Sequence, residues 1–129
     1  MYKVTVAVCC YKQRDWLHRC LRSLIGQTLP TDEFEVIIVN DNPDESLDDI
    51  CSIVEPHLNI RLINNKENIG LPASLNKTLN QSLGRYFVRI DADDYVSKHF
   101  LQSLSLFLDM NRKYQAVACD YKKVDEVGN

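Results

Sequence analysis

Short runs rich in valine and isoleucine alternate along this chain with segments whose apolar residues recur every three or four positions. The first pattern is typical of strands buried on both faces, and the second is typical of helices with one buried side. This alternation constrains the fold strongly, because strands separated by helices form parallel sheets with right-handed crossovers. We therefore expect an α/β fold in which a mostly parallel sheet is flanked by helices, and the length suits a single domain over residues 1–129.

The pattern also gives approximate bounds for each element. The expected strands cover residues 3–10, 34–39, 59–63, 86–90 and 115–119. The expected helices lie between Gln13 and Gly26, over residues 46–54 and 71–83, and from an N-cap at Ser97 to residue 109 or 110. In the third helix, the apolar stripe is expected to be Leu75, Leu79 and Leu83.

Composition excludes several classes of partner. The net charge of -3 provides no overall basic field, so we expect no nucleic-acid partner. The longest apolar run, residues 4–10, is too short to span a bilayer, and the N-terminus lacks the pattern of a signal peptide. We expect no transmembrane segment and a cytoplasmic location, either free or peripheral at the inner face of a membrane.

The cysteines form no CxxC pair, and their number is odd. They are Cys9, Cys10, Cys20, Cys51 and Cys119. We interpret them as small buried apolar residues of a reducing compartment, and not as disulfide partners or zinc ligands.

Three acids, Asp91, Asp93 and Asp94, directly follow the fourth expected strand. Desolvated carboxylates repel one another, and a hard divalent cation is the usual remedy. A metal held by Asp91 and Asp93 would also bridge to phosphate oxygens and stabilise a departing diphosphate. The acids therefore indicate a metal site that faces a phosphorylated ligand.

Tyr11 and Asp41 stand at the ends of the first and second expected strands. In open α/β sheets, ligands bind beyond the carboxyl ends of the strands, at a switch in strand order. Tyr11 offers a ring face to a base, and Asp41 can accept hydrogen bonds from a base N–H or a ribose hydroxyl. Because GxGxxG and GxxxxGK[ST] are both absent, the pattern favours a nucleoside diphosphate pocket without a glycine-rich phosphate loop.

Five segments in order resemble glycosyltransferase family 2, and the resemblance covers nearly the whole chain. These segments are residues 4–11, 21–28, 35–42, 68–76 and 91–94. The resemblance implies a Rossmann-like GT-A fold and a nucleotide-diphosphate-sugar donor. It further implies inverting transfer of the sugar to a glycan or lipid-linked acceptor, as in polysaccharide biosynthesis, aided by Mn²⁺ or Mg²⁺.

Site residues follow from the same resemblance. Asp41 would contact the base, most often uracil, with Tyr11 and Cys9 beside it, so a UDP-sugar is the expected donor. Asp91 and Asp93 match the DxD motif of the family, which implies that Asp93 binds the metal and that Asp91 faces the ribose or the metal. Two further residues, Gly70 with its loop and Asn76, would line the donor pocket.

The chain departs from the family at three positions and in length. Lys12 replaces the usual Asn, Asn40 the usual Asp, and Leu75 a frequent Arg, so a phosphate or ribose contact is in doubt. The family continues with an acceptor-binding half that carries the catalytic base, typically an acid of a Glu-Asp pair. We therefore expect a donor-binding half, truncated before that part, that is inactive by itself and self-associates through exposed apolar surface.

Two other functions remain open at this point. One is a catalytically inactive module that binds a nucleotide or a partner. The other is a Mg²⁺-binding phosphoreceiver module, which also places acids at strand ends. It needs an acid pair after its first strand, whereas this strand ends in Cys10 and Tyr11, so this function ranks lower.

Overall fold

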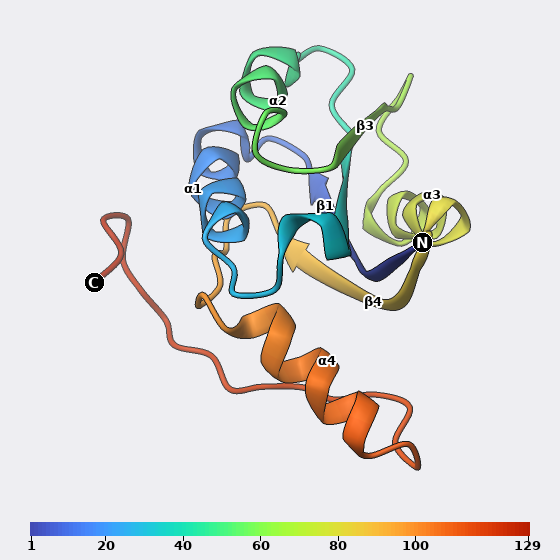
Figure 1. Cartoon of the computed structure of the whole chain (residues 1–129). Helices are drawn as coiled ribbons and strands as arrows, with labels where there is room; N and C mark the ends of the chain where they lie inside the picture. The colour runs from blue at the N-terminus through green and yellow to red at the C-terminus, as the bar shows by residue number, and fades with distance from the viewer.

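Four parallel strands form the centre of the molecule in this computed structural model, which describes residues 1–129 (Figure 1). They are β1 (Tyr2–Cys10), β2 (Phe34–Asn40), β3 (Ile60–Asn64) and β4 (Gly84–Asp91). Their order in the sheet is β3-β2-β1-β4, with Cys9 of β1 opposite Val39 on one side and Asp91 on the other. The chain thus steps outward from β1 to β3 and then returns to the far side of β1, which confirms the predicted parallel α/β sheet.

The helices cover both faces of this sheet. They are α1 (Arg14–Ile25), α2 (Asp48–Val54), α3 (Leu71–Gln81) and α4 (Phe100–Met110), and a 3-10 turn, η1 (Thr31–Glu33), precedes β2. In Figure 1, α1 and α2 lie on one side of the strands and α3 on the other. The main core lies on the side of α1, where Val6 and Val8 pack with Leu17, Leu21 and other apolar side chains. No helix is both long and apolar enough to cross a bilayer.

The opposite face of the sheet combines buried polar and buried apolar side chains, and it corrects the predicted stripe of α3. Ser74 and Thr78 are the buried residues of this helix, whereas Leu79 and Leu83 are 54% and 56% exposed. The sheet side chains on this face include the buried Thr5 and Glu35, which small hydroxyl residues accommodate better than leucines do. The predicted helix is confirmed, but the prediction that its leucines form the buried side is wrong.

Glu35 connects the start of β4 to the centre of the sheet. Its carboxylate accepts hydrogen bonds from the Thr5 hydroxyl at 2.6 Å and from the Leu83 N–H at 2.8 Å, and it pairs with Arg61 at 2.8 Å. A side chain at Gly84 would place its Cβ 2.4 Å from the Thr5 backbone nitrogen. Only glycine therefore fits at this position beside β1, and β4 begins here, ahead of the predicted residue 86, after α3 ends at Gln81.

The predicted strand over residues 115–119 is wrong, because these residues form no backbone ladder. Residues 115–117 instead contribute to an apolar cavity of about 300 Å³ between β4 and α4, so β4 is an edge strand. Cys119 is exposed in this segment, contrary to the prediction of a buried thiol. Ser97 is not the N-cap of α4, since His99 occupies that position.

Candidate functional site

A cavity of about 280 Å³ opens at the carboxyl ends of the strands, where the strand order reverses between β1 and β4. Its walls come from β1 and the turn after it, β2, α3 and β4. The lining residues are Cys9, Cys10, Tyr11, Gln13, Asp41, Leu71, Ser74, Arg89, Asp91 and Asp93. Five residues predicted for the site are therefore brought together, although they come from three distant parts of the sequence.

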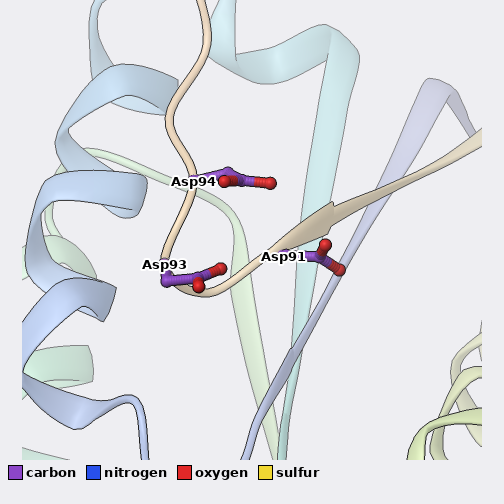
Figure 2. Close-up of side chains that lie close together, drawn as sticks. All are labelled: Asp91, Asp93 and Asp94. Carbon is purple, nitrogen blue, oxygen red and sulfur yellow. The ribbon is translucent and has the colours of Figure 1, made fainter. Parts of the chain in front are cut away.

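The three acids gather where β4 ends. Figure 2 shows the side chains of Asp93 and Asp94 extending from the loop towards the side on which Asp91 lies. One oxygen of each carboxylate lies within 4.8 Å of the others. Ala92 is fully buried, so it fills the core while the acids on either side of it face the cavity.

Electrostatics within this cluster favour a bound cation. Desolvation, followed by repulsion from Asp93 and Asp91, raises the pKa of Asp94 above its ordinary value. A divalent cation relieves that repulsion, and carboxylate oxygens are the ligands that Mg²⁺ and Mn²⁺ prefer. The donor set thus fits a hard divalent metal ion.

Helix α1 holds the segment that carries the acids. Arg19 donates to the Asp93 carbonyl at 3.2 Å, and the Val96 N–H donates to the Ser23 hydroxyl at 3.2 Å. Just beyond the end of α1, the Gln27 amide donates to the Ser97 carbonyl at 2.7 Å and accepts from the Leu101 N–H at 3.0 Å. These positioning residues were not predicted, because polar residues on a helix do not indicate their distant partners.

Asp41 organises the loop that enters α3. Its buried carboxylate accepts hydrogen bonds from the Asn65 amide and from the N–H groups of Ile69 and Gly70, each at 2.9 Å. Gly70 has a φ of 85°, in the left-handed region that favours glycine. Asp41 therefore connects the cavity to the Gly70 loop, which was also predicted to belong to the site. Asn76 is exposed on α3 and does not line the cavity.

Tyr11 and Cys9 form the wall at the end of β1. The Tyr11 side chain is 40% exposed, which leaves part of its ring free for a ligand. Burial, followed by the charge of Asp41, raises the pKa of the Cys9 thiol to about 11. Cys9 is thus a neutral thiol at physiological pH, and it contributes surface rather than charge.

Cys10, interpreted from the sequence only as a buried apolar residue, also lines the cavity, and four further lining residues were not predicted: Arg89, Gln13, Leu71 and Ser74. Arg89 donates to Asp91 at 3.1 Å. A signal was available, because residues two apart on a strand share a face, so Arg89 had to lie on the side of Asp91. The other three depend on how α1 and α3 meet the sheet, which periodicity does not fix.

Comparison with known proteins gives a consistent result. The family model described as Glycosyl transferase family 2 matches residues 5–129. An uncharacterized glycosyltransferase of Haemophilus influenzae is 33% identical over 109 residues, which cover 84% of this chain and 33% of that protein. A poly(ribitol-phosphate) beta-N-acetylglucosaminyltransferase, TarS, of Staphylococcus aureus is 34% identical over 113 residues, covering 84% of this chain and 19% of that protein.

Solved structures of glycosyltransferases share the fold of this chain. The crystal structure of S. aureus TarS 1-349 in complex with UDP matches with a TM-score of 0.80 at 30% identity, covering 85% of this chain and 33% of that one. A mannosyltransferase from Pyrobaculum calidifontis in complex with GDP-Man and Mn²⁺ matches with a TM-score of 0.70 at 27% identity, covering 84% of this chain and 33% of that one. The chain spans about a third or less of the length of these relatives.

Proposed function

Because this chain belongs to glycosyl transferase family 2, we propose that it carries the donor-binding part of an enzyme that transfers a sugar from a nucleoside diphosphate. The acceptor is a hydroxyl of a glycan or a lipid-linked molecule. Residues 1–129 act as one GT-A domain in this proposal. The observation that carries it is the convergence of Asp91 and Asp93 with Asp41 in one cavity at the switch in strand order, with the carboxylate of Asp94 close to the first two.

In this proposal, the residues that line the cavity bind different parts of the nucleotide-sugar donor. The ring of Tyr11 stacks against the base, and Cys9 packs beside it. Asp41 accepts hydrogen bonds from the base or ribose while its existing bonds keep the Gly70 loop in place. Asn76 is assigned to the donor pocket by resemblance alone. UDP and UDP-GlcNAc in S. aureus TarS, and GDP-Man in the archaeal mannosyltransferase, support a nucleotide-sugar donor.

Asp91 and Asp93 are assigned as ligands of Mn²⁺ or Mg²⁺, with Asp94 as the third nearby carboxylate. When bound, the cation offsets the charge of the diphosphate and stabilises it as a leaving group. The Mn²⁺ present with GDP-Man in the mannosyltransferase structure supports this assignment. In the proposed inverting reaction, the acceptor oxygen bonds to the anomeric carbon while the bond from that carbon to the diphosphate oxygen breaks. The proton of the acceptor hydroxyl passes to a general base in the acceptor-binding part of the enzyme.

Melting temperatures measured with UDP, GDP or ADP, each with and without Mn²⁺, test the donor site. A nucleotide at ~100 times its dissociation constant adds roughly 2.7 kcal/mol to the free energy of unfolding. We expect UDP to raise the melting temperature most, and mainly when Mn²⁺ is present. Asp93→Ala should abolish the part of the shift that needs Mn²⁺, whereas Asp32→Ala in the exposed turn η1 should not.

Two outcomes contradict the proposal. If no nucleotide shifts the melting temperature even with Mn²⁺, this chain has no donor site. If Asp93→Ala leaves the shift that needs Mn²⁺ intact, the metal binds elsewhere.

A further inference from the structure

Arg89 is the single positively charged residue among those that line the cavity, whereas three lining residues are acids. It lies two positions before Asp91 on β4, so both side chains project from the same face of the sheet. On that face, α3 packs mainly on β1 and β2 and leaves β4 largely uncovered. The side chains of Arg89 and Asp91 are accordingly 50% and 45% exposed.

The contact between these two residues uses only a small part of the hydrogen-bonding capacity of Arg89. One nitrogen, Nη2, donates to Oδ1 of Asp91 at 3.1 Å, and this is the only hydrogen bond that the Arg89 side chain makes. A guanidinium carries five N–H donors in a fixed planar fork. Ion pairs this exposed are weak, with a median worth of about 0–1 kcal/mol, so a stronger anion can displace Asp91.

The negative charge of the cavity means that a bound diphosphate needs a positively charged group beside it. A diphosphate bound near Asp91 and Asp93 brings its own negative charge into a cavity that Asp41 also lines, and one divalent cation offsets only part of the combined negative charge. The guanidinium of Arg89 supplies a further positive charge on the same wall. Its planar fork matches the oxygens of a phosphate group better than a lysine would.

We propose that Arg89 is a diphosphate-binding residue of the donor site. Its guanidinium leaves Asp91 free for the metal and donates instead to phosphate oxygens of the nucleotide. This assignment rests on the proposed function, because it needs the donor to bind in this cavity.

Isothermal titration with UDP or GDP, whichever stabilises the wild-type chain more, tests the assignment at a fixed concentration of Mn²⁺. We expect Arg89→Ala to weaken nucleotide binding by about tenfold or more, as the loss of a charge-assisted hydrogen bond does. Arg89→Lys should recover part of that loss, because it keeps the charge but not the fork. Arg85→Ala is the matched control, since Arg85 lies on the same strand but lines the apolar cavity.

A second titration, with Mn²⁺ alone, separates this role from one exerted through Asp91. Arg89→Ala removes a cation that competes for Asp91, so we expect Mn²⁺ affinity to stay the same or rise. If Mn²⁺ affinity falls in step with nucleotide affinity, Arg89 acts by holding Asp91 and the assignment is wrong. It is also wrong if nucleotide affinity changes by less than about threefold in Arg89→Ala. If the wild-type chain binds no nucleotide, the proposed function itself fails, and this inference fails with it.

Discussion

Lys12 is the one residue other than glycine with a positive φ, at 58°, and it directly follows Tyr11 of the candidate site. Such a conformation costs an ordinary side chain roughly 1–2 kcal/mol, and asparagine tolerates it better. The ammonium of Lys12 lies 5.2 Å from the centre of the Tyr11 ring, a contact worth about 0.5 kcal/mol at an exposed position. The backbone cost therefore exceeds the gain from the contact. Asparagine is also the residue usual here in the family that the sequence resembles.

We predict that Lys12→Asn raises the free energy of unfolding by about 0.5 kcal/mol, because relief of the backbone outweighs the lost contact. Urea denaturation of the two proteins measures the difference. Lys12→Gln is the control, since it also removes the ammonium but keeps a side chain that disfavours the left-handed region. A loss of stability in Lys12→Asn equal to that in Lys12→Gln would contradict the prediction.

At the scale of elements, the site depends on how β4 is fixed at both ends. Its carboxyl end is held by α1 through Arg19, which donates to the Asp93 carbonyl. Its amino end is held by Glu35, whose carboxylate accepts hydrogen bonds from the Thr5 hydroxyl and the Leu83 N–H on the face of the sheet that α3 covers. The same strand therefore carries the acids of the site and is fixed to the sheet by side chains from other elements.

Replacement of Glu35 tests the amino end of β4. Glu35→Ala leaves the Thr5 hydroxyl and the Leu83 N–H without their acceptor, and each unsatisfied buried group costs about 1–3 kcal/mol. We expect an overall loss of roughly 3 kcal/mol in the free energy of unfolding. The lost ion pair with Arg61 adds little to this figure, because the Arg61 side chain is exposed to water. Urea denaturation measures it, with Glu33→Ala on the exposed turn η1 as a near-neutral control. A loss below about 1 kcal/mol would show that water replaces the carboxylate.

The elements also show what the sequence can and cannot predict. The strands of the sheet and the four helices followed from periodicity, because each buries residues at its own spacing. The inward side of α3 did not, since it depends on the buried Thr5 and Glu35 opposite it. The apolar run over residues 115–119 resembles a strand, but a strand also needs a ladder partner. This segment has none, and its mostly exposed residues only line, at 115–117, the cavity between β4 and α4.

The candidate site was predictable to a similar extent. Tyr11, Asp41 and Asp91 follow separate strands, and in a parallel sheet the carboxyl ends of the strands meet at one edge. Strand alternation could have placed Arg89 beside Asp91, whereas the hydrogen bond from Arg19 to the Asp93 carbonyl depends on how α1 packs against the loop and was not predictable. Strand-end position thus identifies the site, and tertiary packing completes it.

At the scale of the whole molecule, the strand order β3-β2-β1-β4 explains why the functional residues gather at one place. The return of the chain to the far side of β1 leaves a crevice between the connections at the reversal point. The turns after β1 and β2 and the acids after β4 all border this crevice. The proposed donor site therefore follows from the topology, with the end of β4 supplying the proposed metal ligands.

The proposed donor site can be tested by soaking a crystal of this chain with UDP and Mn²⁺. Anomalous scattering then locates the manganese. We predict a manganese peak bound by oxygens of Asp91 and Asp93 at about 2.0–2.3 Å, as is usual for small divalent cations. The base should lie beside Tyr11 and Asp41. A nucleotide bound away from this cavity, or a manganese peak away from both carboxylates, would contradict the central claim.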